Sequence, residues 1–171
     1  MGPHLSKSRE AYFPRLRRKS YRVTSGESKH YNCMAHAVGR DDLPWWPIDA
    51  VGIHWPDGVD KRETLDCFMQ AYATEGYIAC DGVELETGFE KIAIYVSASG
   101  EPTHAARQLD NGHWTSKLGD WEDIQHESLA ALEDDAQARG LGYGRVAQIM
   151  KRPKRGTPTS EESHASQEKG Q

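Results

Sequence analysis

The sequence has few of the features that anchor a chain in a membrane or cross-link it. Its three cysteines (Cys33, Cys67 and Cys80) form an odd set without a short repeated spacing, so a disulfide scaffold is not expected. No apolar run approaches the roughly 20 residues that a membrane helix needs. No apolar signal segment follows the N-terminal Met. We therefore expect no membrane partner and a cytoplasmic location, and leave export without a cleavable signal open.

Nucleotide-binding motifs are also missing. The chain has no glycine-rich phosphate loop and no dinucleotide fingerprint, so we expect no cofactor. Its net charge of −5 is unevenly distributed. Residues 1–30 carry eight Lys or Arg and two Asp or Glu, whereas residues 31–150 carry eight and twenty-one. An acidic body argues against nucleic-acid binding, while the basic run 15–22 suits contact with an acidic partner.

The length of 171 residues suits one domain with a sizeable core. Residues 1–29 are basic with little periodicity, which predicts a poorly ordered arm. Residues 154–171 lack apolar anchors, which predicts a disordered polar tail. The working domain is therefore expected over residues 30–153.

Within this domain, the pattern predicts helices first and strands afterwards. Residues 33–38 have helical spacing and end at Gly39, and residues 62–75 carry an amphipathic stripe. The segment between them, 40–60, is loop-like and rich in tryptophan.

Strands are expected over 77–80, 91–96, 103–109, 113–119 and 143–150, with a further helix over 127–138. Asn111-Gly112 is a strong hairpin signal between two of these strands. The order of elements predicts the α+β class, with N-terminal helices packed on a small antiparallel sheet.

Two residues in this order suggest catalysis. Cys33 lies where a polar segment becomes a helix, and the helix dipole there favours the thiolate. His104 lies just inside a later strand, and a helix-start cysteine with a strand-borne histidine is typical of cysteine hydrolases. Ser116, with Asp120 as the next choice, would orient the imidazole. The side chains of Asn32 and Tyr31, with the backbone N–H of Cys33, would form an oxyanion hole.

Structural roles compete with each of these assignments. A free cysteine such as Cys33 is commonly a buried apolar residue, and His104 would then only pack or cap a turn. Cys67 and Cys80 are expected to be structural. A zinc site using His30, Cys33 and His36 fits no motif spacing that we can justify, so we expect no metal.

Arg107 and the tryptophans are further candidates for binding. Arg107 suits a substrate carboxylate or phosphate, although a salt bridge to the acidic body is the alternative. Trp45, Trp46 and Trp55 would form an apolar wall beside a cleft, or would simply pack in the core.

The motifs resemble those of an uncharacterised bacterial domain family. They are Tyr-Asn-Cys-Met-Ala-His-Ala-Val-Gly (31–39), Trp-Trp-Pro (45–47), Gly-Tyr-Ile-Ala-Cys (76–80), Lys-Ile-Ala-Ile-Tyr (91–95), Thr-His-Ala-Ala-Arg-Gln-Leu (103–109) and Trp-Thr-Ser-Lys-Leu-Gly (114–119). The order of the helix-start cysteine, strands and histidine resembles papain-like hydrolases, with NlpC/P60 and CHAP amidases closest in size. The chain departs from NlpC/P60 enzymes at Lys91, where they carry the base histidine.

The resemblance implies a papain-like fold and a small cysteine hydrolase that acts on an amide, isopeptide or peptide bond. In this reading Cys33 attacks, His104 is the base and then the acid, and Ser116 orients it. The alternative is a non-catalytic binding or interaction module on the same fold, with a tryptophan-rich surface for a ligand or partner.

Overall fold

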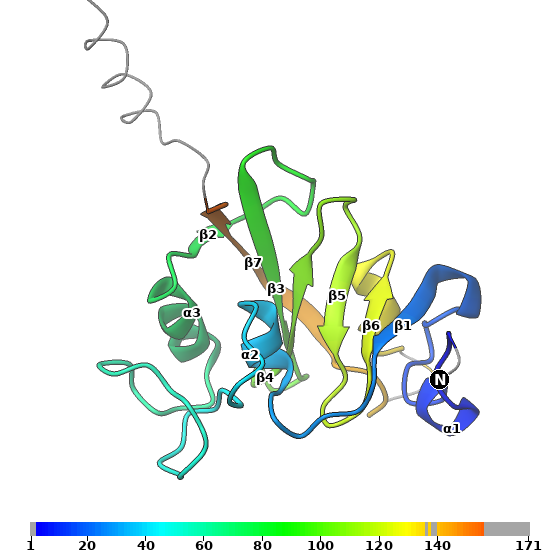
Figure 1. Cartoon of the computed structure of the whole chain (residues 1–171), viewed down its shortest axis with the longest axis horizontal. Helices are drawn as coiled ribbons and strands as arrows, with labels where there is room; N and C mark the ends of the chain where they lie inside the picture. The colour runs from blue at the N-terminus through cyan, green and yellow to red at the C-terminus, as the bar shows by residue number, and fades with distance from the viewer. Residues whose placement is uncertain (1–2, 136, 138–139, 156–171) are drawn as a thin grey trace, which may run out of the picture.

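A seven-stranded antiparallel sheet dominates the computed structural model, which describes residues 3–135, 137 and 140–155 (Figure 1). The strands are β1 (Tyr21–Ser25), β2 (Ile78–Cys80), β3 (Phe89–Val96), β4 (Pro102–Gln108), β5 (Trp114–Lys117), β6 (Asp123–His126) and β7 (Arg145–Pro153). They lie in the order β1-β6-β5-β4-β3-β7-β2, and every neighbouring pair is antiparallel. The chain is therefore a sheet-dominated α+β domain.

Within the described residues, three short α-helices accompany the sheet: α1 (Lys7–Glu10), α2 (Cys33–Ala37) and α3 (Leu65–Ala73). The same part of the chain has 3₁₀ helices over Arg18–Ser20 and Leu129–Leu132. Figure 1 shows α2 in front of the middle of the sheet and α3 beside its β2 end. None of the helices in the described part of the chain is long and apolar enough to cross a membrane.

Each face of the sheet has its own apolar core, because successive side chains of a strand point to opposite faces. One core joins α2 and α3 to Ile92, Ile94 and Ala105. The other joins the N-terminal segment and the Leu129–Leu132 turn to Ala93, Tyr95, Ala106 and Trp114. We call these the helix face and the opposite face.

The N-terminal segment corrects our expectation of a poorly ordered arm over residues 1–29. Leu5, Phe13 and Leu16 are buried in the core of the opposite face. β1 completes one edge of the sheet by pairing with β6. The apolar residues of this segment are isolated among charged ones and show no periodicity. The sequence pattern therefore does not reveal that they are buried in a core.

The basic residues of this segment make contacts within the chain. Arg18 pairs with Glu10 at 3.1 Å, Arg15 lies 3.7 Å from Glu133, and Arg22 donates to Gln125 at 3.0 Å. The expected tail, 154–171, lies almost wholly outside the described residues. Its described part includes Lys154, whose Nζ contacts Asp110 Oδ1 at 2.5 Å.

Most expected elements are present with small shifts at their ends, but the expected helix over 127–138 is wrong. Its described residues contain only the 3₁₀ turn Leu129–Leu132, followed by extended backbone at Glu133. β6 and β1 had not been expected. Gly39 has φ +78°, a left-handed conformation that ends α2 and that L side chains rarely adopt.

Candidate functional site

Cys33 opens α2 and faces the sheet from the helix face. The thiol is buried, and burial raises its pKa to about 11 against the opposing effects of nearby backbone N–H groups, including that of Ala105. Lys117 also opposes the shift through its charge. Within the described residues, the thiol has no hydrogen bond to an imidazole. A thiol in these surroundings is predominantly protonated at neutral pH.

His104 lies on the opposite face of the sheet, so the structure does not bring the expected pair together. Its strand partner is Tyr95, a member of the opposite core, whereas its neighbour Ala105 belongs to the core beneath α2. The imidazole stacks on Tyr143 at 4.0 Å between ring centroids. The prediction of a Cys33–His104 dyad is therefore wrong, because the backbone of the sheet separates the thiol from the imidazole.

Ser116 does contact His104, as expected, but in a buried network without the thiol. Its Oγ lies 2.9 Å from His104 Nε2 and 2.8 Å from His126 Nε2. The Nδ1 atom of His126 lies 2.8 Å from the carbonyl oxygen of Ser128. Burial lowers the pKa of both histidines, which keeps them neutral and suits a structural network.

The helix face carries a different group of polar residues, which we call the Asp123 cluster: Tyr31, His36, Thr115, Lys117 and Asp123. Tyr31 donates its hydroxyl to Asp123 Oδ2 at 2.7 Å, and His36 Nδ1 lies 3.9 Å from the same oxygen. His36 Nε2 contacts Thr115 Oγ1 at 2.9 Å. Burial lowers the pKa of His36, and the charge of Asp123 opposes that shift.

One atom of this cluster has no hydrogen-bond partner among the residues that the structure describes. Asp123 is only 5% exposed, and its Oδ1 is buried without a hydrogen bond to any described residue. Buried polar groups are nearly always hydrogen-bonded, and each exception requires an explanation. A carboxylate only accepts hydrogen bonds, so the group that fits this position is a donor.

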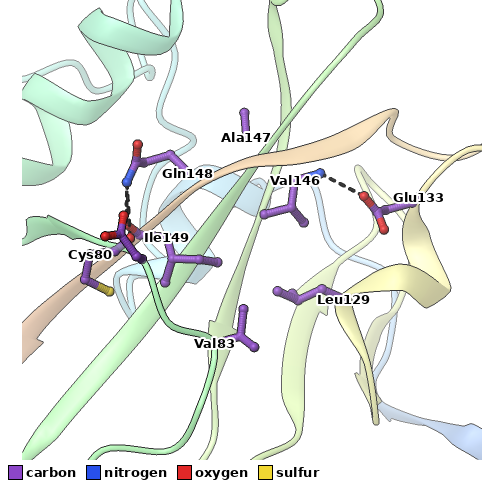
Figure 2. A pocket seen from close by; sticks show the side chains of 9 residues that line it. Cys80, Val83, Leu129, Glu133, Val146, Ala147, Gln148 and Ile149 are labelled. Carbon is purple, nitrogen blue, oxygen red and sulfur yellow. Dashed lines mark hydrogen bonds between the residues drawn. The ribbon is translucent and has the colours of Figure 1, made fainter.

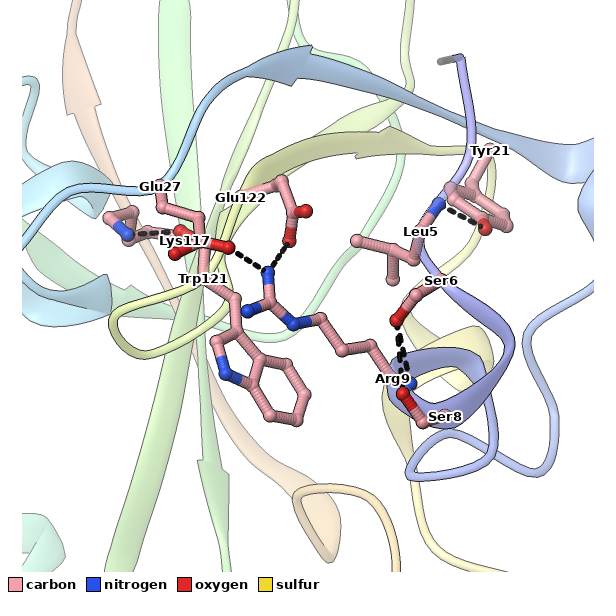
Figure 3. Close-up of polar contacts among 9 residues, drawn as sticks. All are labelled: Leu5, Ser6, Ser8, Arg9, Tyr21, Glu27, Lys117, Trp121 and Glu122. Atoms are coloured by element: carbon pink, nitrogen blue, oxygen red, sulfur yellow. Dashed lines mark hydrogen bonds and ion pairs between the residues drawn. The ribbon is translucent and has the colours of Figure 1, made fainter. Parts of the chain in front are cut away.

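An open hollow of about 530 Å³ lies next to the cluster, lined by Arg9, Glu27, Ser28, Lys29, His30, Asp120 and Trp121. Lys117 connects the two, because its Nζ donates to the carbonyl oxygen of Trp121 and lies 5.2 Å from the ring centroid of Tyr31. Figure 3 shows the guanidinium of Arg9 between Glu27 and Glu122, above the Trp121 ring.

Asn32 has a structural role instead of the expected oxyanion role. Its Oδ1 accepts hydrogen bonds from the backbone N–H groups of Ala35 and Trp45, at 3.1 and 3.0 Å. Its Nδ2 donates to the carbonyl oxygen of Trp45 at 2.8 Å. The side chain caps α2 and ties the following loop to it. Tyr31, the other expected oxyanion donor, is engaged with Asp123.

Trp45, Trp46 and Trp55 mainly make packing contacts and do not form the expected exposed apolar surface. Trp45 and Trp55 are buried, and Trp55 meets Phe68 at 5.1 Å between ring centroids. Trp46 is half-buried and donates its Nε1 to Glu63 at 2.9 Å. The expected apolar wall is therefore mainly packing between the loop and α3.

The two other cysteines also lie apart from Cys33. Cys67 is buried on α3. Cys80 is half-buried at an open hollow of about 420 Å³, with Val83, Leu129, Val146 and Ile149 among its lining residues (Figure 2). In the described part of the chain, no three His, Cys, Asp or Glu side chains are grouped to hold a metal ion.

Sequence reasoning missed His36 as a partner of Asp123, and it missed Thr115 and Asp123 altogether. The two-residue alternation of strands held the relevant signal. Once Ala105 is placed under α2, residues 115 and 117 of the neighbouring strand must face α2 as well, and 104 and 116 must not. The position of Asp123 could not be predicted in this way, because its strand was not expected.

Fold and site together define a sheet-dominated α+β domain with a polar cluster between a short capped helix and the sheet. The chain belongs to the family described as a domain of unknown function, DUF7689, whose model matches residues 22–151. No curated protein and no solved structure shows significant similarity to the chain.

Proposed function

We propose that this domain is a non-catalytic binding module that takes an amine-bearing, peptide-like ligand at the Asp123 cluster. The observation that carries the proposal is the buried Oδ1 of Asp123, which has no partner among the described residues. An ammonium group or an amide N–H supplies the donor that this oxygen needs. Leaving a buried acceptor unfilled costs about 1–3 kcal/mol, so a donor from a ligand recovers that energy.

The surroundings of the cluster support a ligand of this kind. The adjoining hollow has Asp120 in its lining, together with Glu27, which is paired with Arg9, and its volume is in the range of small-ligand sites. Residues 31–150 carry a large excess of Asp and Glu, which attracts a cationic group electrostatically. Trp121 also lines the hollow, with the guanidinium of Arg9 4.9 Å from its ring centroid.

In this proposal the papain-like resemblance concerns the fold alone. A cysteine begins a helix that packs on an antiparallel sheet. The hydrolase interpretation of the same motifs needs a thiolate at Cys33 and a base beside it. A buried thiol with a raised pKa, and a His104 engaged with Ser116 on the opposite face, favour binding over catalysis. A reactive Cys33 thiol would instead support the hydrolase interpretation.

The binding experiment uses two peptides that differ in one charge. Triglycine has a free ammonium group, and N-acetyl-triglycine does not. Isothermal titration calorimetry with the full chain is expected to give saturable binding of triglycine and at least tenfold weaker binding of the acetylated peptide. The same loss is expected for Asp123→Asn, since a hydrogen bond to a charged group contributes about 1.5–3 kcal/mol.

Asp57→Asn is the matched control, because it removes an exposed carboxylate from a loop outside the cluster. It should bind triglycine as the unmodified chain does. Equal affinity for both peptides, unchanged affinity after Asp123→Asn, or no saturable binding of either peptide would contradict the proposal.

A further inference from the structure

A small open hollow lies near one edge of the sheet, where β1, β6 and β5 are neighbours (Figure 1). Its volume is about 180 Å³, and its lining includes Lys19, Ser20, Arg22, His113, Gln125 and Glu127. Sites for whole small molecules usually measure about 300–1,000 Å³, so this hollow suits a single chemical group of a ligand.

Two cations in this lining have no carboxylate partner. Arg15 and Arg18 belong to the same basic run, and each lies within ion-pair distance of a glutamate. Lys19 and Arg22 are exposed, and neither forms an ion pair with a residue that the structure describes. Positive charges that the protein leaves unneutralised in one hollow favour an anionic ligand. Within the basic run 15–22, the hollow therefore singles out Lys19 and Arg22 for contact with an acidic group.

One amide side chain orients two donors of the hollow. Arg22 and Gln125 face each other across β1 and β6, and the guanidinium donates to Gln125 Oε1 at 3.0 Å. Gln125 Nε2 in turn contacts His113 Nδ1 at 3.0 Å. Because the amide nitrogen donates, Nδ1 accepts, and a neutral His113 carries its proton on Nε2. His113 thus offers an N–H donor, and Arg22 retains guanidinium N–H groups that Gln125 does not use.

Glu127 makes the hollow less positive than its cations alone. Its side chain is exposed, and its backbone N–H donates to the carbonyl oxygen of Ser20 at 3.1 Å, which joins the end of β6 to the start of β1. Because it pairs with neither Lys19 nor Arg22, its carboxylate opposes an anion in the hollow without occupying either cation. Removal of this negative charge should therefore strengthen anion binding.

Arg107, the candidate that the sequence suggested for anion binding, is less suitable. It lies on β4 opposite Thr115 of β5, and its Nε is buried without a partner among the described residues. The salt bridge expected as its alternative role is absent from the described part of the chain, so that prediction is wrong. A covered N–H is poorly placed to meet a ligand from solvent, whereas Lys19 and Arg22 are exposed.

We propose that the hollow binds a phosphate group, either free inorganic phosphate or a phosphomonoester, with Lys19, Arg22 and His113 as its donors. A phosphomonoester presents three terminal oxygens, and the hollow offers three donor side chains from separate segments of the chain. The site shares no residue with the Asp123 cluster and takes the opposite charge. It therefore goes beyond the proposed function and does not rest on it.

The test observes His113 directly. In ¹H–¹³C spectra of the full chain, the ring resonance of His113 is assigned by its loss in His113→Gln. It is then followed at about pH 7.5, where a phosphomonoester is mostly a dianion. The ligands are N-acetyl-alanyl-phosphoseryl-alanine amide, the same peptide without phosphate, and sodium phosphate. The phosphopeptide or inorganic phosphate should shift the resonance saturably, the lower Kd identifies the source of the phosphate, and the unphosphorylated peptide should have no effect.

Charge variants separate a built site from general attraction. Lys19→Gln and Arg22→Gln should each weaken binding at least about fivefold, since each removes a hydrogen bond to a charged group. Arg17→Gln is the matched control, because it removes the same charge from the same basic run. Arg17 donates to the carbonyl oxygen of Pro14 and does not line the hollow, so this variant should bind phosphate as the unmodified chain does. Glu127→Gln should tighten binding.

The proposal is overturned if neither phosphate ligand shifts the His113 resonance saturably, or if the unphosphorylated peptide shifts it equally. It is also overturned if Arg17→Gln weakens binding as much as Arg22→Gln, because the attraction would then be general, or if Glu127→Gln weakens binding. The phosphopeptide has blocked ends and thus no ammonium group for the Asp123 cluster, so the two proposals can fail separately.

Discussion

At the scale of single residues, one position along a strand decides the chemistry of this molecule. Ala105 faces α2 and the thiol of Cys33, whereas its neighbours His104 and Ala106 face the other way. A shift of one residue along β4 would have placed an imidazole beside the thiol, because side chains alternate with a period of two. The motif Thr-His-Ala-Ala-Arg therefore predicts the strand well and does not by itself predict the partner of the cysteine.

The reactivity of the three thiols follows from this arrangement. We expect iodoacetamide to modify Cys80 first, because it is half-buried while Cys33 and Cys67 are buried. Cys33 should react slowly, with an apparent pKa well above the free value of about 8.5, since the thiolate is the reactive form. Peptide mass spectrometry of samples alkylated between about pH 7 and 10 measures each rate.

Cys33→Ala should leave the fast phase of alkylation unchanged, and Cys80→Ala should remove it. A single fast thiol at Cys33, slowed by His104→Ala, would instead support the cysteine hydrolase.

At the scale of elements, Asn32 holds α2 in place. Because α2 has only five residues, its stability depends on its cap and its packing more than on its own backbone bonds. Asn32→Ala removes three hydrogen bonds to backbone groups, the capping bond from Ala35 and two bonds with Trp45. We expect a loss of about 2–3 kcal/mol in the free energy of unfolding, measured by urea titration.

Thr64→Ala is the comparison, because Thr64 caps α3 through one hydrogen bond, to the N–H of Cys67. It should cost about 1 kcal/mol, a typical value for a helix cap. If the two variants lose the same stability, Asn32 does not tie the Trp45 loop to α2.

The N-terminal segment provides a second element-scale prediction. Phe13 is 4% exposed in the core of the opposite face, and its ring lies 5.3 Å from that of Tyr143. Phe13→Ala should therefore lower the free energy of unfolding by about 3–5 kcal/mol. Arg17→Ala, at an exposed residue nearby, should change it by less than about 0.5 kcal/mol. Thermal and urea unfolding distinguish this result from that of a loose arm, in which neither change matters.

Helices and strands with a clear period could be predicted from the sequence, and elements defined by tertiary contacts could not. The stripe Leu65, Phe68 and Tyr72 marks α3, and Asn111-Gly112 marks the turn between β4 and β5. β1 and β6 are short and mostly polar along their sequence, so only their pairing defines them. The Asp123 cluster depended on β6 and was therefore missed, while the helix-start position of Cys33 was found.

At the scale of the whole molecule, buried neutral histidines link stability to pH. Burial lowers the pKa of His126 from 6.5 to about 4, and it lowers that of His104 and His36 as well. The unfolded chain binds protons below about pH 6.5 that the folded chain excludes. This contribution is therefore fully present above pH 6.5 and is lost as the pH falls toward 4.

We expect the free energy of unfolding to fall steeply between about pH 6.5 and 4, by roughly 3 kcal/mol for His126 alone. Urea titrations across this range measure the slope. His126→Gln removes the titrating group but retains an amide for Ser116, so its stability should depend less on pH. His30→Gln, at an exposed histidine, should leave the slope unchanged. If His126→Gln and the unmodified chain have parallel pH profiles, protonation of the Ser116 network does not govern acid unfolding, and carboxylates must account for it.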